Sequence, residues 1–514
     1  MNKSNCGIRA CCVLLVCVGA AFALQAQTTA ISSGPPTFTP LESFDYTNGA
    51  YPQAGLVQGV GGSLYGTTFG GGCGESGEEG CGTVFGISPA GKLTVLYVFC
   101  SQGGNECTDG LFPEAGLVQG LDGKFYGTTS NGGAGYGNDY GTVFSITASG
   151  DLTTLYSFCS QGGQQCTDGA TPHAGLVRGA DGNFYGTTGG GGDNVYDAGT
   201  VFRMTPAGKL TTLYSFCSQG GPDCTDGLYP LAGLVQGTDA KFYGTTARGG
   251  ASTGGTVFSI TAAGELTTLY SFENTCTDGC YPVAALVQGT DGNFYGTTST
   301  GGPPPGGDGT VFSITPSGIL TTLHSFEGVD YGDGSYPVAG LVQGTEGNFY
   351  GTTEYGGNNN GQCGPGCGTV FQLTPQGNLT TLHDFCSQGG NGCTDGLEPM
   401  AGLVQDTDGT FYGTTAAGGA DYLGVVYSLS MGLSPFVETN PAAARVGKKV
   451  GILGTNFTGA TGVTFNGTSA AFNVHSPTLI IATVPSGATT GTVQVQLPGG
   501  TLSSNVPFIV LPLH

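Results

Sequence analysis

Residues 174–216 read AGLVRGADGNFYGTTGGGGDNVYDAGTVFRMTPAGKLTTLYSF, and this pattern recurs along most of the 514-residue chain. Its most regular part is Tyr-Gly-Thr-Thr, which begins at positions about 58 residues apart, a spacing typical of repeat folds: Tyr65, Tyr126, Tyr185, Tyr243, Tyr295, Tyr350 and Tyr412. A unit this short cannot bury its own hydrophobic face, so the copies must stack on one another.

Each copy contains four segments that are predicted to be strands. In the third copy they cover residues 174–179, 184–188, 199–205 and 210–216. They are rich in Val, Thr, Phe and Tyr and are bounded by Gly, Asp, Pro and Asn, which favours pleated, partly buried structure. Four antiparallel strands per repeat form a propeller blade, so we predict a seven-bladed β-propeller over residues 37–431.

The ends of the repeat array predict how the ring closes. The last copy lacks a fourth segment, whereas an unmatched segment at residues 38–44 (FTPLESF) precedes the first copy. We expect this N-terminal strand to complete the last blade, because that pairing removes an open sheet edge.

The joints between the segments predict two different faces. The first and second segments, and the third and fourth, are joined by short turns typical of hairpins, such as residues 180–183 and 206–209. The other two joints of each copy are long and variable, and a four-strand meander places both on the same side. We call the two sides the hairpin face and the long-joint face, and we expect recognition on the latter.

The N-terminus and the charge restrict location and partners. Residues 1–26 resemble a secretory signal, with Lys3 and Arg9 before an apolar run at 10–24 and cleavage after Ala23 or Ala26. We therefore expect a secreted, extracellular or cell-surface protein, with the periplasm as an alternative. Without that segment the chain has ten basic and 35 acidic residues, a net charge of −25. We expect neither a nucleic-acid partner nor insertion into a membrane. We expect the protein to be a monomer.

Fourteen of the 18 cysteines lie outside the signal and fall into local pairs within the long joints. An even count in an exported chain predicts disulfides: Cys73–Cys81, Cys100–Cys107, Cys159–Cys166, Cys217–Cys224, Cys276–Cys280, Cys363–Cys367 and Cys386–Cys393. Zinc is the rival for the 276/280 and 363/367 pairs, which have suitable spacing. It is disfavoured because neither has a second pair or a His nearby in sequence.

A carboxylate recurs before the first segment of six copies, in the pattern Asp-Gly-x-x-Pro: Asp109, Asp168, Asp226, Asp278, Asp333 and Asp395. We expect this position near the channel mouth. One interpretation is a ring of ligands for calcium, a cation that favours several oxygen ligands. The other is a turn residue that hydrogen-bonds the backbone two residues on, a role that every blade needs. The turn interpretation is favoured, and no cofactor is predicted.

No catalytic residues are predicted, because none of the five His lies in a nucleophile motif and the sequence cannot measure the separation of carboxylates. Binding candidates come from aromatic residues outside the strand pattern, since flat rings suit sugars. All of these lie in joints between second and third segments: Tyr136, Tyr140, Tyr196, Tyr355 and Tyr422.

From Pro435 the repeat gives way to short strands with Gly or Pro turns, a periodicity typical of a β-sandwich. This part resembles the IPT/TIG family of immunoglobulin-like domains through Asn440-Pro441, GTNF at 454–457, VTFNG at 463–467 and ATVP at 482–485. The resemblance implies a spacer or binding module over residues 433–514, without catalytic residues.

Residues 38–430 resemble a bacterial tandem-repeat family known as GloVer, through the recurring LVQG, DGNFYGTT, GTVF and LTTLYSF segments. This resemblance implies an exported or surface protein. The favoured function is a non-catalytic extracellular binding or interaction protein for a glycan or a surface protein. The alternative is a secreted carbohydrate-active enzyme, a polysaccharide hydrolase or lyase.

Overall fold

The structure is a computed structural model that describes residues 35–59, 61–74, 80–134, 139–193, 196–303, 307–328, 332–357, 363–364, 366–388 and 392–511. These residues form β-strands, joined by turns and three short 3₁₀ helices, η1 (Gly104–Glu106), η2 (Gly163–Gln165) and η3 (Gly221–Asp223). No helix in the described ranges is long and apolar enough to cross a membrane.

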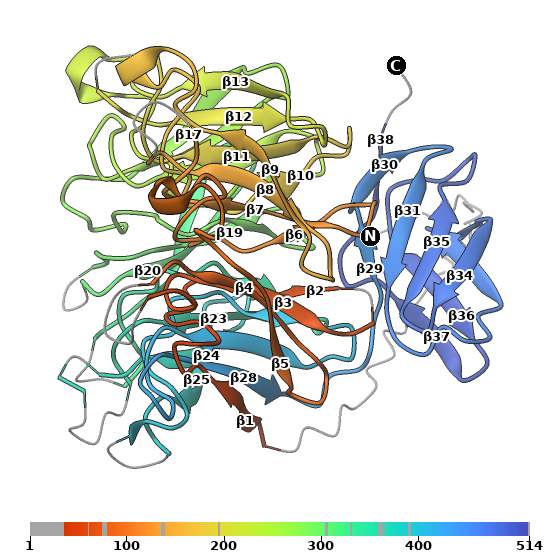
Figure 1. The fold of residues 1–514 in the computed structure, drawn as a ribbon. Coiled ribbons are helices and arrows are strands. Elements are labelled where there is room, and N and C mark those ends of the chain that lie inside the picture. The colour runs from red at the N-terminus through yellow and green to blue at the C-terminus, as the bar shows by residue number, and fades with distance from the viewer. Residues whose placement is uncertain are drawn as a thin grey trace, which may run out of the picture. The chain divides into compact units, whose positions relative to one another are not determined.

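Seven four-stranded antiparallel sheets in the described residues form the blades (Figure 1). The first strands are β2 (Val57–Gln58), β6 (Val118–Gln119), β10 (Val177–Arg178), β14 (Val235–Gln236), β18 (Val287–Gln288), β22 (Val342–Gln343) and β26 (Val404–Gln405). The second strands are β3 (Leu64–Thr68), β7 (Phe125–Thr129), β11 (Phe184–Thr188), β15 (Phe242–Thr246), β19 (Phe294–Thr298), β23 (Phe349–Thr353) and β27 (Phe411–Thr415).

The third strands are β4 (Thr83–Ile87), β8 (Thr142–Ile146), β12 (Thr200–Met204), β16 (Thr256–Ile260), β20 (Thr310–Ile314), β24 (Thr369–Leu373) and β28 (Val425–Ser430). The fourth strands are β5 (Leu93–Val98), β9 (Leu152–Ser157), β13 (Leu210–Ser215), β17 (Leu266–Ser271), β21 (Leu320–Ser325), β25 (Leu379–Asp384) and, for the last blade, β1 (Thr37–Ser43).

The N-terminal strand completes the last blade as predicted. The sheet order is β1-β28-β27-β26, and Phe38 pairs with Leu429. The register shifts between Pro40 and Glu42, so Leu41 occupies a bulge instead of pairing with β28. The same bulge occurs between third and fourth strands of the other blades, for example beside Val201 and Phe202. The N-terminal strand therefore reproduces even the irregularity of the strand that it replaces.

Contacts near the first strands close the ring. The second Thr of each Tyr-Gly-Thr-Thr motif makes a hydrogen bond within its own blade, as between the Thr188 and Thr200 hydroxyls. The first Thr makes a hydrogen bond to the next blade. Thr67 donates to the Ala115 carbonyl of the second blade, and this bond recurs around the ring until Thr414 donates to Ala54 of the first blade.

Small residues allow the blades to approach one another at the axis. The residues that form this axial ring are Gly55, Gly116, Gly175, Gly233, Ala285, Gly340 and Gly402. A Cβ placed on Gly175 would lie 2.9 Å from the Gly116 carbonyl oxygen, and one on Gly55 would lie 3.1 Å from that of Gly402. Larger side chains would hold the blades apart, which explains the Ala-Gly start of the first segments.

Aromatic rings fill the space between neighbouring blades. Tyr185 of the third blade stacks on Phe242 of the fourth at 4.0 Å, and Phe216 meets Phe258 edge-on at 5.2 Å. Related pairs recur around the ring, so most Tyr and Phe of the repeat serve packing, as the sequence indicated.

The C-terminal part is a β-sandwich. One sheet has the order β29-β31-β35-β34 and the other β33-β32-β36-β37, with a parallel pair β30-β38 beside them. The strands are β29 (Glu438–Asn440), β30 (Ala443–Arg445), β31 (Lys449–Leu453), β32 (Gly462–Phe465), β33 (Thr468–Ser469), β34 (Phe472–Ser476), β35 (Leu479–Thr483), β36 (Val493–Leu497), β37 (Gly500–Ser503) and β38 (Ile509–Leu511). Val450, Ile452, Phe465 and Val495 are among its core residues. The predicted all-β fold, a propeller closed by its N-terminal strand and followed by an immunoglobulin-like sandwich, is confirmed.

Candidate binding site at the propeller mouth

The residue before each recurrent proline has an unusual backbone conformation on the long-joint face. We call these seven residues the pre-proline ring: Tyr51, Phe112, Thr171, Tyr229, Tyr281, Tyr336 and Glu398. Their φ angles lie between 49° and 60°. Left-handed φ is costly for bulky residues and persists only where surrounding contacts impose it.

Two backbone hydrogen bonds impose this conformation in every blade. The Tyr336 N–H donates to Asp308 of the preceding blade, and its carbonyl accepts from the N–H of Glu354 in its own blade. The same pair of bonds holds Tyr51, whose N–H donates to Leu423 of the last blade. The backbone of the pre-proline ring is therefore anchored on both sides, which fixes the points from which its side chains project.

The residue after each of these prolines forms a second ring, two positions before the axial ring. This mouth ring consists of Gln53, Glu114, His173, Leu231, Val283, Val338 and Met400. Its members from adjacent blades lie side by side, because a Cβ on Gly189 would meet both His173 and Leu231, at 2.9 and 3.1 Å. Three neighbouring positions are polar and the other four are apolar, so the mouth has two chemically different arcs.

The polar arc contains a hydrogen-bonded chain across two blades. The Ser130 hydroxyl donates to Glu114 Oε1 at 2.9 Å, and Glu114 Oε2 lies 2.6 Å from His173 Nδ1. Glu114 therefore orients the imidazole, and Nδ1 is the nitrogen that faces the carboxylate.

Two carboxylates and two tyrosines lie where the sixth and seventh blades meet. Burial raises the pKa of Glu354 and the charge of Glu398 raises it further, while Tyr355 opposes the shift by a hydrogen bond. Burial also raises the pKa of Glu398. The Tyr355 ring lies 5.9 Å from that of Tyr336, which is 38% exposed. Two carboxyl groups and two tyrosine rings therefore lie close together at this junction between blades.

The five loop tyrosines predicted from the sequence occupy different environments. Tyr355 lies at the mouth, beside the pre-proline ring. Tyr196 and Tyr422 are exposed side chains farther along their joints. Tyr140 is half-buried against the Cys159–Cys166 loop, and its carbonyl accepts from Thr171, so it anchors that joint. Tyr136 lies outside the described residues.

Sequence reasoning missed the pre-proline and mouth rings. Their signal was present in the Asp-Gly-x-x-Pro pattern, since the residue before Pro is aromatic in five of the seven copies and the residue after it varies in character.

The six recurrent Asp residues contact the fourth strand of the preceding blade. Asp168 Oδ2 accepts from the Tyr156 hydroxyl at 2.7 Å and from the Ser160 N–H at 3.0 Å. Burial and the hydrogen bond to Asp168 raise the pKa of Tyr156 to about 12. In two blades a His replaces this Tyr: His324 lies 3.1 Å from Asp333, and His383 lies 3.1 Å from Asp395.

These contacts tie the carboxylate to the outer strand of the preceding blade and to the joint that follows it, where Gln161 also donates its N–H to Asp168. In the part of the chain that the structure describes, no Asp of this set lies within a cluster of three or more potential metal ligands. The carboxylates therefore have structural partners in the preceding blade, and the turn and calcium interpretations both stay predictions.

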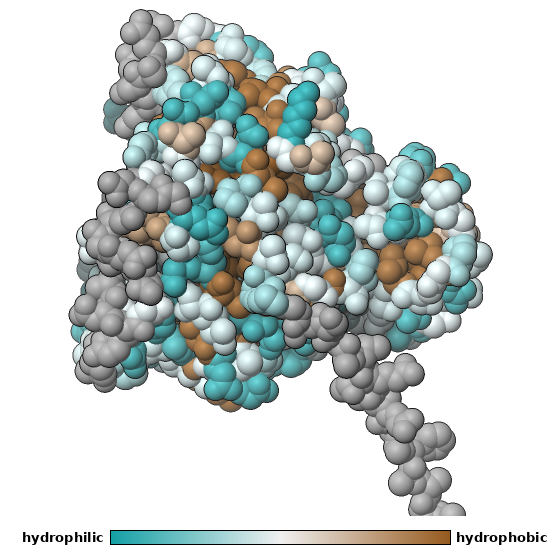
Figure 2. All heavy atoms as spheres, turned by 90° about the horizontal axis from the view of Figure 1, so that it is seen from below, coloured by the Kyte–Doolittle hydropathy of each residue, from teal (hydrophilic) through white to brown (hydrophobic). Residues whose placement is uncertain are grey.

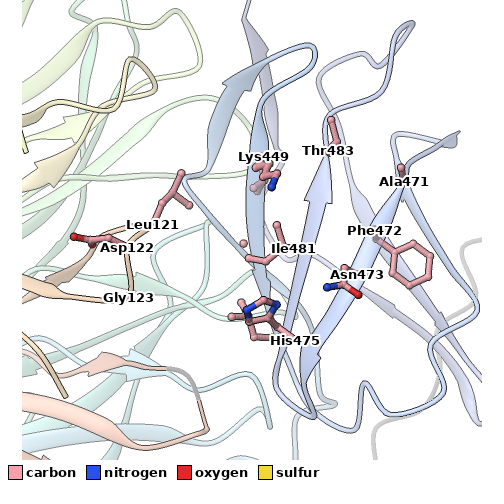
Figure 3. A pocket seen from close by; sticks show the side chains of 13 residues that line it. Leu121, Asp122, Gly123, Lys449, Ala471, Phe472, Asn473, His475, Ile481 and Thr483 are labelled. Carbon is pink, nitrogen blue, oxygen red and sulfur yellow. The ribbon is translucent and has the colours of Figure 1, made fainter. Parts of the chain in front are cut away.

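A separate cavity of about 620 Å³ is lined by Leu121, Asp122 and Gly123 of the hairpin after β6 together with residues of the sandwich (Figure 3). His475, Phe472 and Asn473 from β34 and Ile481 and Thr483 from β35 are among them. The cavity is open and mixed in polarity, and among the described residues no hydrogen bond joins His475 to a second titratable group. Figure 2 likewise shows small hydrophobic patches interrupted by hydrophilic side chains.

All seven predicted disulfides form, with sulfur partners four to eight residues apart, as in Cys276–Cys280 and Cys73–Cys81. Each closes a loop on the long-joint face. Disulfides of this kind fit an extracellular protein.

Two family models match this chain and together extend over most of it. The Gloeobacter/Verrucomicrobia repeat matches residues 19–166, 164–363 and 232–472, and the IPT/TIG domain matches residues 436–510. No curated protein matches the chain.

Among solved structures, a protein described as a gluconolactonase matches with 10% identity and a TM-score of 0.38, over 78% of this chain and 93% of that one. A protein from Bacteroides uniformis described as a 6-phosphogluconolactonase matches with 14% identity and a TM-score of 0.40, over 69% of this chain and 96% of that one. Because the repeat matches extend over most of the sequence, the chain belongs to the Gloeobacter/Verrucomicrobia repeat family and carries a C-terminal IPT/TIG domain.

Proposed function

We propose that this protein is an exported binding protein whose propeller mouth, on the long-joint face, binds part of a glycan. The observation that carries the proposal is the mouth itself. Tyrosines, carboxylates and one imidazole occupy the pre-proline and mouth rings and their neighbouring joints, on a backbone that is anchored in every blade.

The chemistry of the mouth suits a sugar ring. A pyranose has an apolar face of C–H groups and an edge of hydroxyl groups. Tyr336 is 38% exposed and offers a flat surface for the apolar face. Tyr281 is 37% exposed, and the Arg248 guanidinium lies over its ring, 5.5 Å from the centroid. Glu114 and Glu398, which are half-buried, offer oxygen acceptors for the hydroxyl edge. Few polar groups on an aromatic surface are the usual composition of a small-ligand site.

Rigidity supports the same proposal. The pre-proline ring is held by two backbone hydrogen bonds per blade, so its main chain loses little conformational freedom when a ligand binds. The net charge of −25 after loss of the signal segment favours neutral or cationic glycans over polyanionic ones.

The test is retention and breakdown of a panel of immobilised polysaccharides. Tyr336→Ala and Tyr281→Ala should each weaken retention by about 1 to 3 kcal/mol if they are true anchors. Lys209→Ala, in a turn of the hairpin face, is the matched control and should leave retention unchanged. Loss of binding in the Lys209 variant but not in the tyrosine variants would contradict the proposed face.

A second function is favoured by one observation, the two carboxylates with raised pKa, Glu354 and Glu398. A carboxyl group whose pKa is raised by burial is a candidate for the general acid of a glycoside hydrolase. If a retained polysaccharide is also cleaved, Glu354→Gln and Glu398→Gln should abolish cleavage while retention persists. Cleavage that survives both substitutions would exclude this pair.

A further inference from the structure

Two disulfides of the sixth blade lie against each other. Cys363–Cys367 closes the joint between β23 and β24, and Cys386–Cys393 closes the joint that follows β25. The four sulfur atoms all lie within 4.8 Å of one another. Cys367, Cys386 and Cys393 are buried, and Cys363 is half-buried. Within the described ranges, no other group of three or more His, Cys, Asp or Glu residues is this close.

The sequence had argued against zinc because Cys363 and Cys367 have no second pair nearby in the chain. Both pairs form the predicted disulfides, and the turn between β24 and β25 also brings the second pair next to the first. The ligand order is then C-x3-C followed by C-x6-C, and the first of these spacings is typical of structural zinc sites.

We propose that these four cysteines form a Zn²⁺ site when both disulfides are reduced. Four thiolates around a tetrahedral Zn²⁺ have Zn–S distances of about 2.3 Å, which places the sulfur atoms about 3.8 Å apart. Sulfur atoms that already lie within 4.8 Å reach this arrangement with small side-chain movements. The sixth blade can therefore be closed in two ways, by two disulfides or by one metal ion.

Reduction of the two disulfides, followed by binding of Zn²⁺, converts the first closure into the second. A thiol or phosphine reductant supplies four electrons and is itself oxidised, and four protons convert the two disulfides into four thiols. Binding of Zn²⁺ then releases those four protons and forms four Zn–S bonds, so the affinity falls at low pH.

Zinc would also connect parts of the chain that the disulfides leave separate. Each disulfide ties residues within one joint, whereas the metal would tie the joint before β24 to the joint after β25. The Cys367 carbonyl accepts the N–H of Glu398 in the pre-proline ring, so this closure lies directly behind the mouth.

The first blade provides an internal comparison. Its two joints also carry two disulfides, Cys73–Cys81 and Cys100–Cys107, but among the described residues their sulfur atoms form no such four-membered group. The Cys73→Ser, Cys81→Ser variant is therefore a matched control for Cys363→Ser, Cys367→Ser.

The experiment uses the full chain without its signal segment. The protein is reduced with a phosphine, freed of reductant without oxygen, and titrated with Co²⁺ and then Zn²⁺. We expect one Co²⁺ per chain with the intense thiolate-to-cobalt absorption of tetrahedral sites, displaced by Zn²⁺. We also expect Zn²⁺ to raise the Tm of the reduced protein.

Cys363→Ser, Cys367→Ser should weaken this binding at least about 100-fold, because two of four ligands are lost. The first-blade variant should bind like the wild type. A chain that keeps only the four sixth-blade cysteines should still bind one ion, which excludes the other pairs. Equal binding by the wild type and the sixth-blade variant would overturn the proposal. So would loss of binding in the first-blade variant, or loss of β-structure on reduction that Zn²⁺ does not restore.

Discussion

Replacing Phe44 by alanine tests how the ring is closed. Phe44 follows β1, and its side chain is completely buried. It meets Phe85 of the first blade edge-on, with ring centroids 5.2 Å apart. The same cluster contains Leu56 and Leu64 of the first blade and Val426 of the last. Phe44 thus fills the seam between the two ends of the repeat array.

The expected cost follows from that burial. Truncating a fully buried Phe to Ala costs about 3 to 5 kcal/mol, since transfer energy is lost and a cavity remains. For a large domain each kcal/mol lowers the Tm by roughly 2 to 4 °C, so we expect a decrease of about 6 to 20 °C. Phe158, equally buried and edge-on to Phe202 at 5.3 Å, is the equivalent residue of an internal blade.

The assay is thermal and urea unfolding of the chain without its signal segment, followed by circular dichroism and by tyrosine fluorescence, because the chain has no Trp. Phe44→Ala and Phe158→Ala should cost similar amounts, since the cavities are similar. Deleting residues 27–45 should cost more than either and should promote concentration-dependent association, because β28 becomes an exposed edge. A truncated protein that melts with the intact one would refute this account of closure.

Three other results are expected. The oxidised protein should contain no titratable thiol and should weigh 14 hydrogens less than its reduced form, because seven disulfides form; two or more free thiols in the native protein would contradict this pairing. Asp168→Ala should lower the stability by about 1 to 3 kcal/mol, equally with calcium and with a chelator, because it leaves buried donors unpaired; a loss seen only with calcium would favour the metal. Burial, and then the charge of Asp408, raise the pKa of Asp406 to about 6. The folded chain therefore holds a proton that the unfolded chain has lost, so stability should fall as the pH rises from about 4 to 6, and Asp406→Asn should reduce that fall and raise the Tm at pH 7. An unchanged pH profile of the Tm in this variant would show that Asp406 does not titrate as described.

Much of the architecture followed from local pattern. Strand segments, hairpin turns and cysteine pairs involve residues close together in the chain, so composition and spacing identify them directly. The repeat adds a constraint on long-range structure, because identical units must meet through identical surfaces. The missing fourth segment and the unmatched residues 38–44 then indicated the closing strand, which pairs with β28.

The site required three-dimensional information. Glu114 and His173 belong to different blades, and Glu354 and Glu398 are brought together only where two blades meet. The position of these residues in the repeat shows which ring they occupy, but not which neighbours they touch or how burial changes their pKa.

Periodicity and short separations along the chain report local geometry, so they were enough to identify the strand pattern, the propeller and the disulfide partners. The folded structure was needed to show that the backbone of the pre-proline ring is anchored in every blade and that the mouth ring has a polar and an apolar arc. It also decided that two disulfides separated in sequence bring four sulfur atoms together. Distances between blades depend on how whole sheets pack around the axis, and that packing is the combined result of contacts that no single repeat contains.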